Sequence, residues 1–127
     1  MSGKLNLNNE EGAAIRGQQV IHPAPNELFL DLDSMKALSF LNEQLLGTLG
    51  DDETLNLEVI SRMPSRTKEH WHVILRSRSR TFTPAERIAL QACLGSDLKR
   101  ELYSLVRHLK GEKGTTFYEN PDWKDPR

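Results

Sequence analysis

Two short segments of this chain place apolar residues at every second position, which is the spacing of a β-strand with one buried face. The apolar positions are Leu28, Leu30 and Leu32 in the first segment and Trp71, Val73 and Leu75 in the second. A shift of one residue in strand pairing would turn either face away from the core. The pattern therefore constrains the strand register and predicts a sheet built on these two segments.

Turn and cap residues predict the elements around these strands. Asp33 or Ser34 can begin a helix that ends near residues 47–50, and Leu55, Leu57 and Val59 predict a strand that forms a hairpin with the second segment. Thr83, Pro84 and Glu86 form a capping-box pattern for a helix to Leu94, and Ser96 can cap the next helix. The expected buried stripe of that helix consists of Leu98, Leu102, Leu105, Val106 and Leu109, and residues 115–119 predict a last strand.

The order strand, helix, strand, strand, helix pair, strand predicts an α+β fold. A single split β-α-β-β-α-β sheet, RRM-like or ferredoxin-like, satisfies this order with helices on one face and the other face open. A length of 127 residues fits one domain. We expect a flexible N-terminal arm over residues 1–26, a single α+β domain over 27–119 and a C-terminal tail over 120–127.

Composition limits the functional classes. The single cysteine, Cys93, excludes an internal disulfide framework and predicts a small core residue in a cytoplasmic, reducing environment. No apolar run approaches the roughly 20 residues that span a bilayer, so we expect no membrane partner. Charge is uneven, because residues 62–110 contain 11 Lys/Arg and 4 Asp/Glu although the net charge is -1. Such a cationic segment attracts polyanions, or it is a solvated surface of mixed sign.

The second face of each predicted strand carries polar residues that indicate a site. Asp31 and Asp33 lie two residues apart, as do His70 and His72, so both pairs are expected on the open face of the sheet. Carboxylates suit Mg²⁺ or Mn²⁺, and imidazoles suit Zn²⁺ or other transition metals. The alternative is structural, with Asp33 capping a helix, Asp31 paired with an arginine, and two histidines on an exposed face.

Basic residues flank the hairpin, and a guanidinium fork matches the geometry of a phosphate group. The candidate phosphate-binding residues are His70, Arg62, Arg66, Arg76 and Arg78. The alternative is again a solvated basic surface. Tyr103, near Lys99 and Arg107 on the last helix, is a candidate nucleophile, although helical tyrosines more often pack at the margin of a core.

Residues 28–34 resemble the first motif of the archaeo-eukaryotic primase superfamily, in which hydrophobic residues lead into Asp-x-Asp, and residues 65–73 resemble its second motif, a serine followed by a strand-borne histidine. The resemblance implies an RRM-like catalytic core in a DNA replication protein, as in a phage or mobile element. It implies Asp31 and Asp33 as ligands of Mg²⁺ or Mn²⁺ and His72 as a phosphate contact. For the family's third acidic motif the chain offers only Glu119, and it is shorter than typical primases, so a reduced or degenerate relative fits better.

His70-Trp71-His72 also resembles the His-hydrophobic-His motif of rolling-circle replication initiators and small transposases. This resemblance implies a metal site completed by Asp31 or Asp33 and a tyrosine nucleophile, for which Tyr103 is the candidate. Valine stands at position 106, where many initiators have a lysine three residues after the tyrosine.

Three functions are therefore expected as alternatives. The first is a nucleic-acid or nucleotide-binding protein that resembles a minimal primase-like nucleotidyltransferase and uses a divalent metal, with Asp31, Asp33 and His72 as catalytic residues. The second is a tyrosine endonuclease that acts on single-stranded DNA. The third is a non-catalytic binding or inhibitor protein that kept the fold.

Overall fold

The computed structural model describes residues 10–64 and 70–127. Its helices are α1 (Glu10–Ile15), α2 (Met35–Leu46), α3 (Pro84–Cys93) and α4 (Leu98–Leu109), and its strands are β1 (Gln19–Ile21), β2 (Glu27–Leu32), β3 (Leu57–Pro64), β4 (Trp71–Ser77) and β5 (Phe117–Glu119). The α+β class expected from the sequence is confirmed. Among the described residues, no helix has the length and apolar character needed to cross a bilayer.

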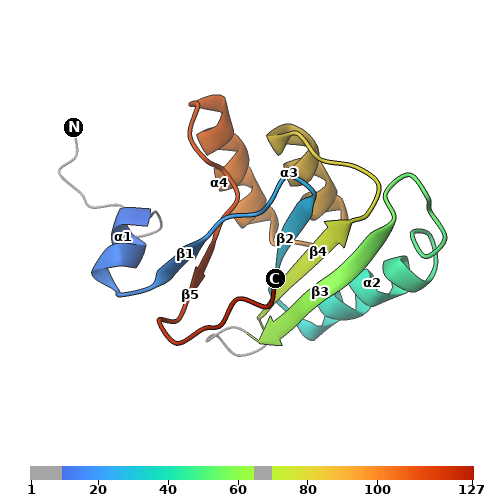
Figure 1. The fold of residues 1–127 in the computed structure, drawn as a ribbon, viewed down its shortest axis with the longest axis horizontal. Coiled ribbons are helices and arrows are strands. Elements are labelled where there is room, and N and C mark those ends of the chain that lie inside the picture. The colour runs from blue at the N-terminus through green and yellow to red at the C-terminus, as the bar shows by residue number, and fades with distance from the viewer. Residues whose placement is uncertain (1–9, 65–69) are drawn as a thin grey trace.

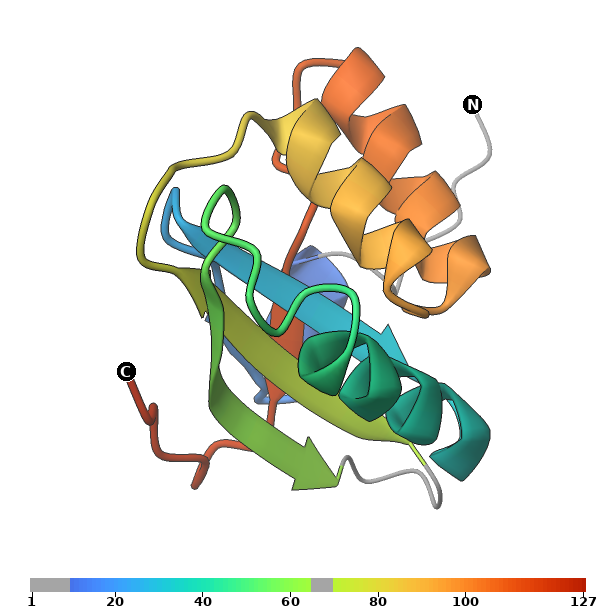
Figure 2. The same ribbon diagram turned by 90° about the vertical axis from the view of Figure 1, so that its right-hand side faces the viewer.

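The strands form two antiparallel sheets (Figure 1). The larger sheet has the order β2-β4-β3, and the smaller consists of β1 and β5. Figures 1 and 2 show α2 on one side of the larger sheet, the β1-β5 sheet on the other, and α3 and α4 side by side above the β2 edge. The molecule is thus layered, with the larger sheet in the middle.

The predicted alternation of β2 and β4 is confirmed. Leu28, Leu30, Leu32, Val73 and Leu75 are fully buried in a core that Leu38 and Leu41 of α2 complete. The helix caps follow local rules, since the Ser34 hydroxyl accepts a hydrogen bond from the Ala37 N–H and Thr83 forms the full capping box with Glu86.

The sequence predicts that the other face of the larger sheet is open, but this face is covered. Phe29 of β2 and Ile74 of β4 pack there against Ile21 of β1 and Phe117 of β5. Residues 19–21, assigned above to an arm outside the domain, pair with residues 117–119 and so belong to the fold. The C-terminal segment contributes too, because Trp123 packs on this second cluster.

The expected single split sheet is not confirmed, and the reason lies at the outer edge of β2. The Phe29 N–H donates to Oε1 of Gln91 (2.8 Å) and the Asp31 N–H to Oγ of Ser96 (3.0 Å). The Phe29 carbonyl accepts from Nη1 of Arg100 at 2.5 Å, and the Asp31 carbonyl from the Asp97 N–H at 2.7 Å. Groups from α3, α4 and their linker thus satisfy the backbone where a fourth strand would pair.

Helix α4 is oriented opposite to the expectation. Glu101 and Ser104 are buried, whereas Leu98 is 69% and Leu109 is 76% exposed. The amphipathic pattern predicted the reverse, but the polar side of α4 is needed at the β2 edge. Two smaller expectations are also wrong: Asp97 rather than Ser96 caps α4, and Cys93 is exposed.

Candidate functional site

His72 lies between two carboxylates on the face of the larger sheet that β5 covers. It is the cross-strand partner of Asp31. The N–H and C=O of Asp31 point away from β4, to Ser96 and Asp97, so this is a non-hydrogen-bonded pair, the kind that brings side chains closest. Nε2 of His72 is 3.8 Å from Oδ1 of Asp31, and its Nδ1 forms a hydrogen bond with Oε1 of Glu119.

Ring stacking holds this imidazole in place. The His72 ring lies 4.3 Å from the Phe117 ring, centroid to centroid, and nearly parallel to it, and Phe117 stacks on Phe29 at 4.5 Å. The guanidinium of Arg100 lies 5.3 Å from the Phe117 ring centre, within the range of a cation–π contact. The histidine therefore has both a fixed position and fixed partners.

Asp31 retains an unsatisfied acceptor. Its Oδ1 atom is buried and has no hydrogen-bond partner among the described residues. Buried carboxylate oxygens are nearly always satisfied in folded proteins, and exceptions occur at sites that receive water, an ion or a ligand. Asp31 lines two neighbouring pockets, so its side chain borders space that such a group can occupy.

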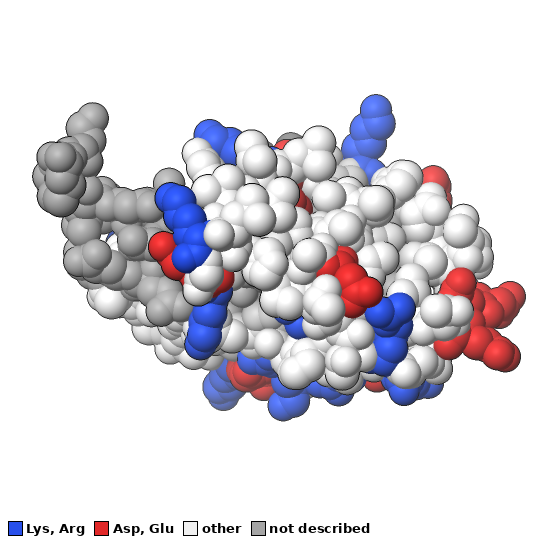
Figure 3. Space-filling model, turned by 90° about the horizontal axis from the view of Figure 1, so that it is seen from above, with Lys and Arg blue, Asp and Glu red and all other residues white. Residues whose placement is uncertain are grey.

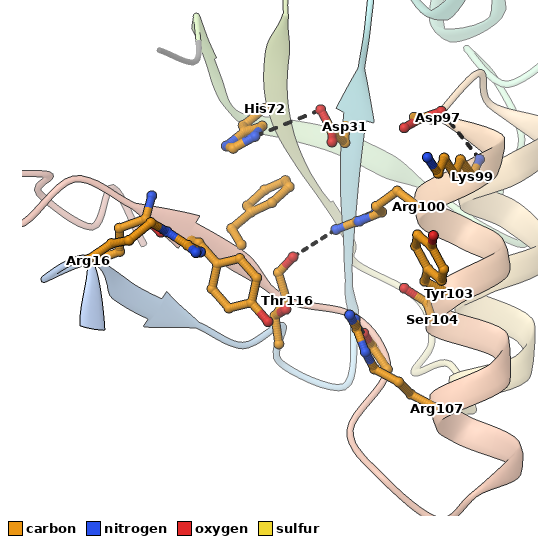
Figure 4. Close-up of a pocket in the computed structure, with 14 residues that line it drawn as sticks. Arg16, Asp31, His72, Asp97, Lys99, Arg100, Tyr103, Ser104, Arg107 and Thr116 are labelled. Carbon is orange, nitrogen blue, oxygen red and sulfur yellow. Dashed lines mark hydrogen bonds and ion pairs between the residues drawn. The ribbon is translucent and has the colours of Figure 1, made fainter. Parts of the chain in front are cut away.

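The larger of these pockets, about 430 Å³, lies between α4 and the β1-β5 sheet (Figure 4). Four cationic side chains line it: Arg16, Lys99, Arg100 and Arg107. Asp31 and Asp97 are the two carboxylates of the lining, so the cations outnumber them. A cleft lined by charges of one sign concentrates counter-ions even when the whole protein carries little net charge.

The cations come from two separated parts of the chain. Arg100 and Arg107 are seven residues apart on α4, and therefore on one side of that helix, while Arg16 follows α1. Figure 4 shows Arg16 reaching into the pocket from the side opposite to α4. Arg100 is held by the Phe29 and Thr116 carbonyls and by Glu101, so much of its charge is already used.

Hydroxyl groups add further polar contacts. Tyr103 and Ser104 of α4, Tyr118 of β5 and Thr116 all line the larger pocket. Tyr103 is 48% exposed, so its ring and hydroxyl are accessible. The second pocket, about 300 Å³, shares Asp31, His72, Gln18 and Tyr118 with the first and adds His70 to its lining.

The residues predicted from the sequence are only partly brought together. Asp31, His72 and Tyr103 line one pocket, and His70 joins Asp31 and His72 in the other. Asp33 lies beyond the end of β2, is exposed and lines neither pocket. The alternation that would align it with Asp31 ends with the strand at Leu32, where the chain turns into the cap of α2.

Two of the predicted arginines, Arg62 and Arg78, lie away from these pockets. Arg62 donates to Oδ1 of Asn42 at 3.0 Å, Arg78 pairs with Glu58, and Arg66 lies outside the described residues. Arg62 and Arg78 line neither of the two pockets that contain His72. Arg62 lies within β3 and Arg78 directly after β4, and each contacts a polar side chain outside the pockets.

Arg76 is on the predicted face but at its far end. It contacts Oε2 of Glu27 at 3.0 Å, and Arg127 contacts Oε1 of the same carboxylate at 2.8 Å. Burial raises the pKa of Glu27, but hydrogen bonds from the Ala24 N–H and from both arginines outweigh it and hold the pKa below its usual value. Arg76 therefore has a structural partner.

The donor set for a divalent cation is incomplete in the described part of the chain. No group of three or more His, Cys, Asp or Glu side chains there is arranged to hold a metal. The expected pair is split, since Asp31 lines the pockets and Asp33 does not. Mg²⁺ or Mn²⁺ stays a prediction of the primase resemblance, and these residues do not fit the two-carboxylate site that it implies.

Sequence reasoning missed Arg16 and Arg100 as pocket residues. The sequence indicates Lys99 and Arg107 only as neighbours of Tyr103. The spacing of Arg100 and Arg107 on α4 is a visible signal, but nothing in the local sequence connects Arg16 to that helix. Their proximity depends on the pairing of β1 with β5.

Comparison with known proteins finds no matching family model, no similar curated protein and no similar solved structure. The primase and rolling-circle resemblances therefore stay predictions.

Proposed function

We propose that the protein binds phosphate groups of nucleic acid or nucleotides in the cationic pocket between α4 and the β1-β5 sheet. The observation that carries this proposal is the gathering of Arg16, Lys99, Arg100 and Arg107 around one pocket in a chain whose net charge is -1. Arginine binds phosphate in a bidentate manner, and lysine adds a point charge.

The pocket suits such a ligand in size and in lining. A volume of about 430 Å³ lies in the range of small-molecule and cofactor sites, roughly 300–1,000 Å³. The exposed ring of Tyr103 at its wall offers a surface for stacking a base. Asp31 and His72 also line the pocket and place a carboxylate and an imidazole beside the ligand.

The proposal covers binding and does not include a metal-dependent step. Nucleotidyl transfer, which the primase resemblance implies, requires a metal site that the described donors do not form. Binding without turnover corresponds to the third expectation above, a binding or inhibitor protein that kept the fold.

Fluorescence anisotropy with labelled single-stranded DNA, single-stranded RNA and a nucleoside triphosphate tests the proposal. The double variant Lys99→Gln and Arg107→Gln should weaken binding roughly tenfold or more and lower its salt dependence, because each lost phosphate contact removes counter-ion release. The matched control is Arg62→Gln with Arg78→Gln, the same change in charge away from the pocket. The pocket assignment is contradicted if both double variants weaken ligand binding equally, or if neither of them weakens it.

A second candidate is the tyrosine endonuclease, favoured by one observation: Tyr103 lines the same pocket as Asp31 and His72. Attack of the Tyr103 hydroxyl oxygen on a DNA phosphorus, with a sugar hydroxyl leaving, would join the DNA covalently to the protein. The test is a denaturing gel of protein incubated with labelled single-stranded DNA and Mn²⁺. An adduct that disappears in Tyr103→Phe favours this activity, and absence of an adduct in the unaltered protein rejects it.

A further inference from the structure

The exposed side of α4 is strongly apolar. Leu98, Leu102, Val106 and Leu109 are 69%, 58%, 40% and 76% exposed. Leucines at 98, 102, 105 and 109 follow a four-three-four spacing, the pattern of a helix that packs against another helix. This side faces away from the protein because Glu101 and Ser104 occupy the inner side of the helix.

Helix α3 extends this apolar surface with small residues. Ala85, Ala89 and Cys93 recur every fourth position and are all exposed. Helices α3 and α4 lie side by side and are joined by only residues 94–97. Figure 3, which looks down on these helices, shows a broad surface without charged side chains and charged residues around it. We call this surface the α3-α4 face.

The α3-α4 face is complementary to itself. Leucines project from α4, while the α3 part of the face carries small side chains over which leucines of another copy can pack. By helical spacing, Lys99 and Lys110 lie at the outer edge of α4 and Glu86 lies at the outer edge of α3. A two-fold axis parallel to the helices sets α4 of one copy on α3 of the other and brings the lysine edge of α4 toward Glu86, whose carboxylate also pairs with Arg80 at 3.0 Å.

The size of the face sets the expected strength. Helices of 10 and 12 residues are about 15 and 18 Å long and about 10 Å wide, so the face measures roughly 350 Å² in projection. Because side chains project from this face, its accessible surface is larger than its projection. Two copies packed face to face would bury about 1,000 Å² in total, which is the lower end of the range for specific interfaces. Such an interface supports association at micromolar rather than nanomolar concentration.

We propose that the protein forms a symmetric dimer through its α3-α4 face, with α4 of each copy packed on α3 of the other. The dimer does not depend on phosphate binding. It removes from water the leucines of α4 that the fold of one copy leaves exposed.

Sedimentation velocity of the full chain, from low-micromolar to near-millimolar concentration, tests the dimer. The unaltered protein should shift from monomer to dimer over this range. The double variant Leu98→Glu and Leu102→Glu should stay monomeric. Leu98→Glu also favours the helix locally, because a carboxylate in the first turn complements the helix dipole. The matched control is Leu46→Glu, an 87% exposed leucine on α2, which should dimerise like the unaltered protein.

Two further measurements address α3. Ala89→Glu places a charge in the middle of the α3 part of this face and should also prevent dimerisation. The rate at which a thiol reagent modifies Cys93 should fall several-fold as the concentration of the unaltered protein rises, and should stay constant in the double variant. A monomer at all concentrations overturns the proposal, as does a dimer that persists in both the double variant and Ala89→Glu. Equal loss of dimer in Leu46→Glu also overturns it.

Discussion

Glu101 offers the sharpest test of how α4 is held against the larger sheet. Its carboxylate is 3% exposed and accepts hydrogen bonds from Nε2 of Gln91 (2.8 Å), Oγ of Ser96 (2.6 Å) and Nη1 of Arg100 (2.6 Å). These three donors are among the groups that satisfy the outer edge of β2. Replacing Glu101 with leucine removes the acceptor they share while keeping a good helix former of similar size.

We expect Glu101→Leu to lower the free energy of unfolding by about 3 kcal/mol. Breaking one partner of a buried ion pair typically costs about 3–5 kcal/mol, because the remaining charge stays buried. The lower end applies here since Arg100 keeps two carbonyl acceptors, those of Phe29 and Thr116. A domain of this size has only about 5–15 kcal/mol of stability, so the effect is large.

Urea unfolding followed by circular dichroism measures this change, and amide hydrogen exchange locates it. The amides of Phe29 and Asp31 should lose protection, because they donate to Gln91 and Ser96. The matched control is Glu112→Leu, the same substitution at an exposed position, which should change stability by less than about 0.5 kcal/mol. A cost below about 1 kcal/mol for Glu101→Leu, with both amides still protected, would show that this network does not hold the β2 edge.

Three other predictions concern stability. Glu27→Gln should lower the melting temperature at neutral pH and make the melting temperature fall less steeply in acid. The pKa of Glu27 is lowered in the folded protein, so the stability contributed by this carboxylate is complete above about pH 4.5 and is lost as the pH falls through the folded-state pKa. A pH profile of melting temperature that is the same in Glu27→Gln as in the unaltered protein contradicts this prediction. Thr83→Ala should lower the free energy of unfolding in urea by about 1 kcal/mol because it removes the capping box. An unchanged free energy of unfolding would show that the capping box does not stabilise the protein. Gly114→Ala should cost about 1–3 kcal/mol, because a Cβ there would lie 2.7 Å from the Ser104 carbonyl oxygen; the same unfolding assay should show a loss rather than a gain.

The sequence predicts the strands well where one face of the strand is buried in the core. The faces of β2 and β4 and the caps of α2 and α3 follow from local patterns, and all four are confirmed. The same alternation places Asp31 and His72 on one face of the sheet, although their direct pairing depends on the register of β2 with β4. Local rules suffice for these features because each depends on residues close in sequence or on a strictly alternating face.

The failures come from long-range contacts. The amphipathic pattern of α4 predicts its leucines inside, but the backbone edge of β2 draws Glu101 and Arg100 inward instead. The pairing of β1 with β5 joins residues about a hundred positions apart and brings Arg16 to the pocket. Neither event leaves a local signature, so the cationic pocket could not be assembled from the sequence.

The outer edge of β2 has a consequence for how the protein behaves at high concentration. An exposed strand edge is a template on which another chain can add a strand, and this is a common route to aggregation. The side chains and backbone groups of α3, α4 and their linker already occupy that template. At the opposite edge, β3 carries an irregularity between Val59 and Ser61 and ends in Pro64, two features that interrupt strand addition. The larger sheet is thus protected at both margins, and intermolecular β-pairing is disfavoured there.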